Sequence, residues 1–356
     1  MSPVEIIQQF QIEGKVLEVK PMGEGFINDT LIVKTEGEAP DYILQRKNHL
    51  VFPDVPAMMD NIVAVTEHIK AKVADPSRET LTVIPTIDGK YYYQDGENFW
   101  AVCTLIPEVL SYVKADTVDL AYQGGVGIGR FQTLLADFDK TLAVTLKGFH
   151  DMAYRFEEWD KAIREDKAGR VASVQEEISW IESRRKEMSD FYALIQNGTI
   201  PTRVAHNDTK ISNILFNTDG SVLCAIDLDT VMSSTSLNDV GDALRSYTNT
   251  TFEDDPNYEN VAMDIQMFEA WIKGYLSERK DTLTDSEKEY LAFSGRFITY
   301  EQVLRFLMDY INGDTYYKIK YPEHNLVRTR SQYALLCSME AQYETMQNIV
   351  KDLLCA

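Results

Sequence analysis

The chain is poor in cysteine, in long apolar runs and in basic residues, and each shortage excludes a class of protein. Its four cysteines stand far apart with no Cys-x-x-Cys pair, which argues against a zinc site and a disulfide framework. No uninterrupted run approaches the roughly 18 apolar residues of a membrane-spanning helix. The first ten residues also lack the basic flank and apolar core of a signal peptide. We therefore expect a cytoplasmic protein that does not contact membranes.

Basic residues are outnumbered, since 35 Lys and Arg face 56 Asp and Glu and give a formal net charge of −21. Nucleic acids and anionic membrane surfaces recruit dense basic patches, so neither is an expected partner. A nucleotide is not excluded, because backbone N–H groups, a few cations and a divalent ion can hold its phosphates. An acidic surface also leaves small cationic molecules open as ligands.

The length of 356 residues predicts two lobes rather than one core. Apolar alternation and turn residues predict a helix over about 56–73 and strands over 15–21, 26–34, 42–46, 81–85, 90–93 and 99–105. From about residue 106 the pattern turns mainly helical. We expect a β-rich N-terminal lobe over 1–105 and a helical C-terminal lobe over 106–356, an α+β fold.

Three polar residues, Asp208, Asn213 and Asp227, stand at the spacing of a kinase catalytic loop. In that arrangement the first Asp orients and deprotonates the attacking hydroxyl, and the Asn and the second Asp hold magnesium. The sequence thus predicts Asp208 as the base and Asn213 and Asp227 as Mg²⁺ ligands. The alternative is that Asp208 and Asn213 cap a turn and Asp227 ends a strand. His206, two residues before the base, is interpreted as scaffold.

A hairpin predicted between Asn213 and Asp227 favours the catalytic interpretation. Asp219 and Gly220 stand between two apolar runs, and Asp-Gly in that position is a hairpin signal. Asn213 and Asp227 are then both expected toward the open end of the hairpin.

Nucleotide-binding candidates lie in the N-terminal hundred residues. Gly23-Glu24-Gly25 separates the first two predicted strands, and such glycines let backbone N–H groups approach phosphates. The third strand ends in Gln45 where protein kinases place a phosphate-binding Lys. Lys47 falls on the same strand face and could supply that charge, or Gln45 could bond the phosphates itself. Ile106 begins a segment expected to serve as a hinge whose backbone meets adenine.

A second glycine cluster, over 124–129, resembles a phosphate loop only superficially. Arg130 stands where its third glycine would fall, and no strand precedes it. We predict small residues that let helices pack closely. His150 and Asp151 are likewise interpreted as a helix terminus rather than a metal dyad.

The segments 204–215 and 226–230 resemble the aminoglycoside phosphotransferase and choline kinase superfamily, and with 321–330 they are most similar to the N-acetylhexosamine 1-kinases. The resemblance implies a bilobal protein-kinase-like fold. It also implies ATP- and Mg²⁺-dependent phosphorylation of the anomeric hydroxyl of N-acetylglucosamine or N-acetylgalactosamine. The partners implied are a small sugar and ATP.

The resemblance also assigns residues to the sugar. Arg305 and Tyr316 or Tyr317 fall where those kinases place sugar contacts, and Asp242 and Arg245 are further substrate candidates with surface ion pairing as the alternative. Asp239 matches a superfamily Asp that braces the catalytic loop.

Two positions depart from the N-acetylhexosamine 1-kinase pattern. Phe26 stands where those kinases have His, and Ser246 where they have Phe. The departures predict a reshaped sugar pocket.

Other functions stay open at the sequence level. One is a kinase of choline, homoserine or an aminoglycoside. Another is a nucleotide-binding pseudokinase scaffold, which only Gln45 suggests.

Overall fold

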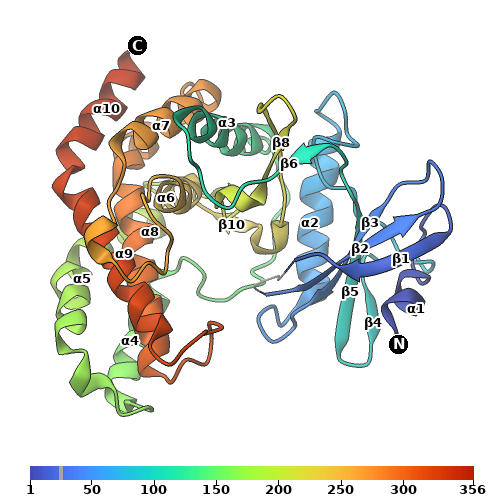
Figure 1. Ribbon diagram of the computed structural model, residues 1–356. Helices are drawn as coiled ribbons and strands as arrows, with labels where there is room; N and C mark the ends of the chain where they lie inside the picture. The colour runs from blue at the N-terminus through green and yellow to red at the C-terminus, as the bar shows by residue number, and fades with distance from the viewer. Residues whose placement is uncertain (24–26) are drawn as a thin grey trace. The chain divides into compact units, whose positions relative to one another are not determined.

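The computed structural model describes residues 1–23 and 27–356, which form two compact units. The first comprises Met1–Leu110, Leu134–Lys147 and Leu215–Ser233. The second comprises Ser111–Thr133, Gly148–Ile214 and Ser234–Ala356. Each unit is assembled from separate stretches of the chain (Figure 1). The predicted lobes 1–105 and 106–356 are continuous segments and stay a prediction.

A five-stranded sheet forms the body of the first unit, with strand order β1-β2-β3-β5-β4 and antiparallel pairing throughout. Alternation of apolar residues places Val33, Tyr42, Leu44 and Val102 in the core of this unit. The strands are β1 (Val16–Pro21), β2 (Asp29–Thr35), β3 (Tyr42–Lys47), β4 (Tyr93–Asp95) and β5 (Asn98–Thr104), preceded by the short helix α1 (Pro3–Ile7).

The predicted strand over 81–85 is absent. Val83 forms a single bridge to Cys103, with two backbone hydrogen bonds between this segment and β5. Pro85 has no N–H to continue the ladder, which explains why the pairing stops. The strand predicted over 90–93 begins later, as β4.

Helix α2 (Val55–Lys70) begins at Asp54, whose side chain accepts a hydrogen bond from the N–H of Ala57. Its apolar stripe is buried as predicted, at Met58, Ile62 and Val65. A three-stranded sheet of order β6-β8-β9 completes the first unit. Its strands are β6 (Val109–Leu110), β8 (Ile214–Asn217) and β9 (Val222–Ala225).

The second unit is mainly helical. Its central helix α8 is buried along most of its length and packs against α4, α6 and α9. The elements are α3 (Val118–Leu134), α4 (Met152–Glu165), α5 (Gln175–Gln196), β7 (Arg203–Ala205), α6 (Ser236–Tyr247), α7 (Ile265–Arg279), α8 (Asp285–Ile311), α9 (His324–Ala341) and α10 (Tyr343–Cys355). The short strand β10 (Met232–Ser234) precedes α6.

The glycines of α3 allow close helix packing, as predicted. A Cβ on Gly125 would lie 2.1 Å from the carbonyl oxygen of Trp271 in α7, and one on Gly129 would lie 2.8 Å from Glu278 Cβ. A Cβ on Gly274 of α7 would in turn lie 2.0 Å from the carbonyl oxygen of Tyr122 in α3. The two helix backbones can approach this closely only without side chains.

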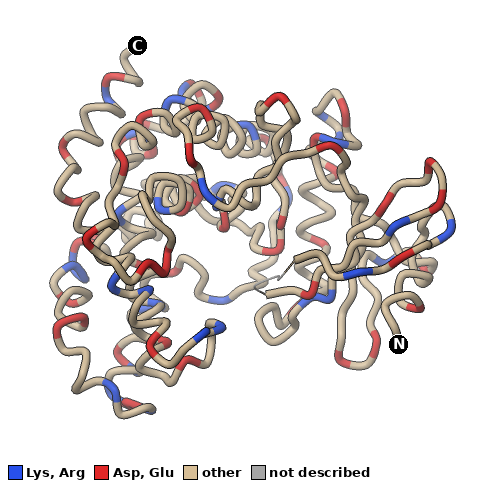
Figure 2. The backbone as a smooth tube through the Cα atoms, in the orientation of Figure 1, with Lys and Arg blue, Asp and Glu red and all other residues tan. Residues whose placement is uncertain are grey.

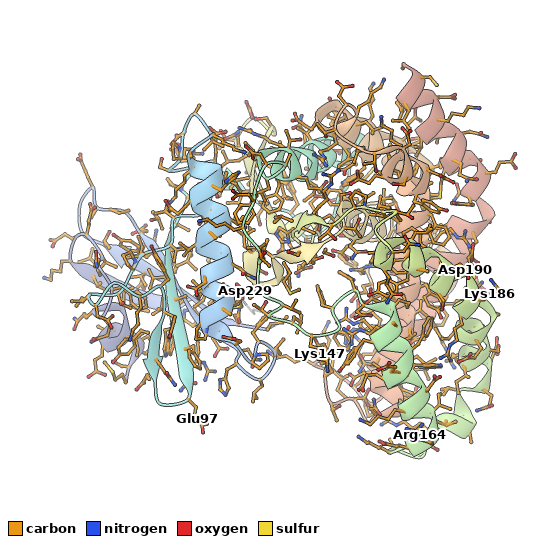
Figure 3. The ribbon with its side chains drawn as sticks, turned by 180° about the vertical axis from the view of Figure 1, so that it is seen from behind. Glu97, Lys147, Arg164, Lys186, Asp190 and Asp229 are labelled. Atoms are coloured by element: carbon orange, nitrogen blue, oxygen red, sulfur yellow. The ribbon has the colours of Figure 1, made fainter. Side chains whose placement is uncertain are left out.

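The predicted surface helices over 151–196 are α4 and α5. Asp151 caps α4 through the N–H of Tyr154, which confirms it as a helix terminus. Lys186 and Asp190 form an exposed pair on α5 (Figure 3). Asp and Glu residues are distributed along both units (Figure 2). No described helix has the length and apolar character needed to cross a membrane.

Candidate active site

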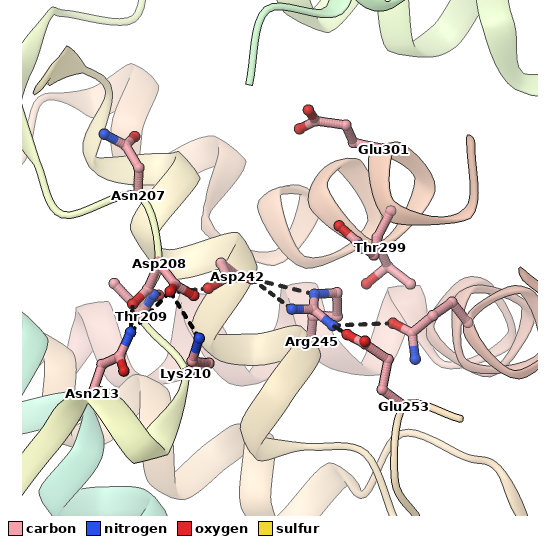
Figure 4. A network of polar contacts seen from close by, with 12 residues as sticks. Asn207, Asp208, Thr209, Lys210, Asn213, Asp242, Arg245, Glu253, Thr299 and Glu301 are labelled. Atoms are coloured by element: carbon pink, nitrogen blue, oxygen red, sulfur yellow. Dashed lines mark hydrogen bonds and ion pairs between the residues drawn. The ribbon is translucent and has the colours of Figure 1, made fainter. Parts of the chain in front are cut away.

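Asp208 follows β7 and is held by two nitrogen donors (Figure 4). Lys210 Nζ donates to Asp208 Oδ2 at 2.9 Å, and Asn213 Nδ2 donates to the same oxygen at 3.0 Å. Burial raises the pKa of Asp208, but Lys210, His206 and Asn213 outweigh it and bring the pKa below its usual value. Asp208 is therefore ionised at neutral pH and can accept a hydrogen bond from a hydroxyl group.

The backbone around Asp208 is fixed by two carboxylates of α6. Asp239 accepts hydrogen bonds from the N–H groups of His206 at 3.1 Å and Asn207 at 2.7 Å. Asp242 accepts one from the N–H of Thr209 at 2.8 Å. Asp239 is fully buried, and burial raises its pKa. These contacts agree with the expectation that Asp239 braces the loop.

His206 has the surroundings expected of a scaffold residue. Its side chain is fully buried and lies edge-on to the ring of Phe131, with ring centroids 5.7 Å apart. Its Nδ1 accepts a hydrogen bond from the N–H of Asp208 at 3.3 Å. A ring that accepts this bond helps to orient the loop.

The substrate candidates Asp242 and Arg245 are paired with each other. Arg245 Nη2 lies 2.9 Å from Asp242 Oδ1, and Arg245 Nη1 lies 2.6 Å from Glu253 Oε2 (Figure 4). Arg245 also donates to Gln332 Oε1 at 3.3 Å. Asp242 thus binds the backbone of the loop at Thr209, and Arg245 pairs with Asp242 and Glu253. Contact of either residue with substrate stays a prediction.

A second brace reaches the loop from α8. His150 contacts Glu301 Oε2 through Nδ1 at 2.7 Å and the carbonyl oxygen of Asn207 through Nε2 at 3.0 Å. Burial raises the pKa of Glu301, but His150, Arg305 and Arg155 outweigh it and lower the pKa to about 2. The sequence predicts His150 only as part of a helix terminus and gives no sign of the role of Glu301.

Arg305, the predicted sugar contact, lies one turn beyond Glu301 on α8. Its guanidinium lies 5.3 Å from the ring centroid of Phe149, 5.8 Å from Tyr316 and 5.6 Å from Tyr317. Its Nη1 donates to Gln302 Oε1 at 3.3 Å. Among the described residues, no carboxylate lies within 4.0 Å ion-pair distance of Arg305. The structure thus brings Arg305 and both tyrosines together.

Asp309 holds the segment 315–317, which contains both tyrosines, in place. The sequence did not indicate this role. Asp309 accepts hydrogen bonds from the N–H groups of Thr315, Tyr316 and Tyr317 at 2.9, 2.9 and 3.0 Å. Asn325, in the 321–330 motif, donates to Asp309 at 2.9 Å. The available signal was an Asp ahead of Gly313 at a helix end, where such residues bind nearby N–H groups.

The predicted hairpin is formed by β8 and β9, with Gly220 at φ 87° in the turn. Asn213 directly precedes β8, and Asp227 comes two residues after β9. Asp227 adopts a left-handed conformation, φ 59° and ψ 55°, at the start of the 3-10 turn Leu228–Thr230. Such a conformation is uncommon outside glycine and is enriched at functional sites.

Lys47 and Gln45, the two phosphate-binding candidates, contact each other. Lys47 Nζ donates to Gln45 Oε1 and to Asp229 Oδ1, each at 2.7 Å. Gln45 Nε2 donates to Thr30 Oγ1 at 3.2 Å. Asp229, whose side chain is labelled in Figure 3, did not enter the sequence prediction.

The remaining nucleotide candidates lie in the first unit. Ile106 follows β5, and its side chain is buried among Leu215, Leu223 and Cys224. Gly23 has φ 66°, which suits a turn. Glu24 and Gly25, with the departure Phe26, lie outside the described residues.

Comparison with known proteins identifies the family. The sequence pattern of the phosphotransferase enzyme family matches residues 18–275, more than half of the chain. The chain belongs to this family.

Solved structures of the same fold include several phosphotransferases. An aminoglycoside phosphotransferase from Alicyclobacillus acidocaldarius superposes with a TM-score of 0.61 at 12% identity, over 97% of either chain. Choline kinase from Streptococcus pneumoniae gives 0.55 at 15% identity, over 91% of this chain and 94% of its own. A spectinomycin phosphotransferase in complex with ADP and spectinomycin gives 0.57 at 12% identity, over 96% and 97%. These likenesses establish the protein-kinase-like α+β fold of this phosphotransferase.

The metal candidates have the chemistry that magnesium requires. Both hydrogen bonds from Asn213 to Asp208 use Nδ2, so the carbonyl oxygen Oδ1 is the atom through which Asn213 could bind a cation. Among residues 1–23 and 27–356, no three His, Cys, Asp or Glu side chains gather as a metal cluster. A set of one amide and one carboxylate suits magnesium, which also binds water and nucleotide phosphates.

Proposed function

We propose that this phosphotransferase transfers the γ-phosphoryl group of ATP to the anomeric hydroxyl of an N-acetylhexosamine, giving the sugar 1-phosphate. Family membership supports phosphoryl transfer, and complexes of related folds with ADP support the nucleotide. Asn213 and Asp227 would hold Mg²⁺, which neutralises the phosphate charge when bound. Gly23 and the backbone of Ile106 are proposed nucleotide contacts.

Asp208 acts on the acceptor hydroxyl in this proposal. A carboxylate with a lowered pKa is a weak base, so it orients the hydroxyl first and takes its proton late in the transfer. This is sufficient, because the transition state is loose and depends on position and charge more than on a strong nucleophile. Asp239 and His150, which contacts Glu301 of α8, fix the backbone of the neighbouring Asn207 for that task.

The surroundings of Arg305 are the observation that favours a neutral sugar over a cationic acceptor. Arg305 is a buried guanidinium beside three aromatic rings, and no described carboxylate lies within 4.0 Å of it; Glu301 acts on it only from farther away. Its positive charge disfavours a cationic acceptor. Arg305 suits a neutral acceptor that offers hydroxyl and carbonyl oxygens, because guanidinium donates in a fixed fork. Choline and aminoglycosides carry positive charge, whereas N-acetylhexosamines do not.

A kinase of choline or an aminoglycoside is the second candidate. The named activities of the proteins with this fold and the net charge of −21 favour it. The local charge at Arg305 opposes it. Ser246, in the last turn of α6, and Phe26 remain the positions proposed to alter sugar preference.

ADP release should be measured with N-acetylglucosamine, N-acetylgalactosamine, choline, homoserine and an aminoglycoside as acceptors. We expect turnover with at least one N-acetylhexosamine. We also expect Arg305→Met to raise the KM for that sugar by about tenfold or more, the loss of one charged hydrogen bond. Arg164→Met, which removes the same charge from an exposed position on α4, is the control and should change KM little. Faster turnover of choline than of every hexosamine would reject the proposal.

A further inference from the structure

Asp229 has both carboxylate oxygens engaged by the protein. Its Oδ1 accepts a hydrogen bond from Lys47 Nζ, and its Oδ2 accepts one from Asn28 Nδ2, each at 2.7 Å. Asp229 and Lys47 are 5% and 4% exposed, so neither charge is solvated. A buried ion pair with both oxygens satisfied is costly to break from one side. Asp229 is thus fixed where it lies, two residues after the proposed metal ligand Asp227.

Lys47 is fixed by the same contacts. Its Nζ lies between Gln45 Oε1 on its own strand and Asp229 Oδ1. A lysine that binds phosphates does so as a point charge on a flexible side chain. Here the ammonium binds a carboxylate of the loop after β9.

The pair joins three segments of the first unit. Asn28, which donates to Asp229, also accepts a hydrogen bond from the N–H of Asn48 at 3.1 Å. It directly precedes β2, and Lys47 ends β3. Beyond Asp229, the carbonyl oxygen of Val231 accepts a hydrogen bond from Asn61 of α2 at 3.1 Å. The turn that begins at Asp227 is therefore held from β2, β3 and α2.

We propose that the Lys47–Asp229 pair, with Asn28, is a positioning device for the metal ligand Asp227, and that Lys47 acts through Asp229 rather than on the phosphates. The left-handed backbone of Asp227 needs such support, because that conformation is strained for a residue with a side chain. Groups that orient a metal ligand affect metal affinity without touching the metal. The inference rests on the nucleotide and magnesium part of the proposed function alone.

A double-mutant cycle without any sugar tests this inference. Binding of a fluorescent ATP analogue would be titrated with Mg²⁺ in the wild type, Lys47→Met, Asp229→Asn and the double variant. We expect each single variant to raise the Mg²⁺ concentration for half-maximal binding by about tenfold, as for other groups that orient metal ligands. The double variant should show about the same increase, because both changes remove one device.

The half-buried pair Lys34–Asp41 in the same unit provides the control. Lys34→Met with Asp41→Asn removes an equivalent ion pair at strand β2 and should leave the Mg²⁺ dependence unchanged. Should a single variant fail to fold, the double variant still decides, since it leaves no buried charge unpaired.

Two outcomes would overturn the inference. Increases that multiply to about a hundredfold in the double variant would mean that Lys47 and Asp229 act independently. Unchanged Mg²⁺ dependence in the double variant would mean that the pair only stabilises the fold. Because no acceptor is present, neither outcome depends on the sugar assignment.

Discussion

Different residues hold the side chain of Asp208 and the backbone around it. The side chain bears one oxygen that receives hydrogen bonds from both Lys210 and Asn213. Its neighbours His206, Asn207 and Thr209 give their N–H groups to α6. The carboxylate is thus held by its side-chain partners and its position is set by the backbone.

Replacing Asp208 by Asn tests its proposed role as the base. Asp208→Asn should retain the fold, since Asn keeps the shape and can still bond Asn213. Turnover should fall by about a hundredfold or more, the range for loss of a general base. Steady-state kinetics at saturating ATP would measure it. Asp219→Asn, an exposed change in the nearby hairpin turn, should leave the rate unchanged, and equal rates in both variants would refute the role of Asp208.

At this scale the sequence predicts what local spacing determines. Asp208, Asn213 and Asp227 could be found because they lie within twenty residues and flank a recognisable hairpin. The contact between Lys47 and Asp229 could not be predicted, because the two residues are 182 positions apart and only tertiary folding joins them. Glu301 and Asp309 escaped for the same reason, because a buried carboxylate on a helix looks like any charged helix residue.

Among the elements, the contact between α3 and α7 depends most visibly on small residues. Gly125 and Gly274 let the two backbones approach, and the bulky Trp271 and Tyr275 of α7 pack beside them. Gln132 of α3 then reaches both Asp239 at 2.9 Å and the hydroxyl of Tyr275 at 2.7 Å. The close packing therefore supports Asp239, the carboxylate that binds the loop around Asp208.

Glycine-to-alanine changes in two helices should have opposite effects. Gly125→Ala would place a Cβ 2.1 Å from the Trp271 carbonyl oxygen, and such overpacking costs about 1–3 kcal/mol of unfolding free energy. Gly295→Ala in α8 would meet Leu244 at 3.4 Å, an ordinary contact, and should be neutral or stabilise by up to about 1 kcal/mol. Urea denaturation would measure both. Equal stability of the two variants would refute the packing argument.

The elements themselves were largely predictable from periodicity and turn chemistry. The hairpin around Gly220, the buried stripe of α2 and the capping role of Asp151 follow local rules that the structure confirms. The segment over 81–85 was predicted as a strand because its residues favour one. Whether it extends along β5 depends on Pro85 and on neighbours that a single sequence does not reveal.

For the whole molecule, family and fold are established, and the acceptor is the open chemical question. The net charge of −21 describes the surface and says little about the surroundings of one buried side chain. In the proposed function, the positive charge of the buried Arg305 opposes a cationic acceptor despite that net charge. The sequence could predict the fold from the catalytic spacing, but the acceptor depends on contacts that converge from distant segments.

The position of the phosphate in the product tests the central claim most directly. The enzyme would be incubated with ATP, Mg²⁺ and each N-acetylhexosamine, and the product would be examined for its reducing end and its stability in mild acid. We expect a sugar 1-phosphate, which has lost the reducing end and releases phosphate in mild acid. A product phosphorylated at C6, which keeps its reducing end and resists mild acid, would contradict the claim.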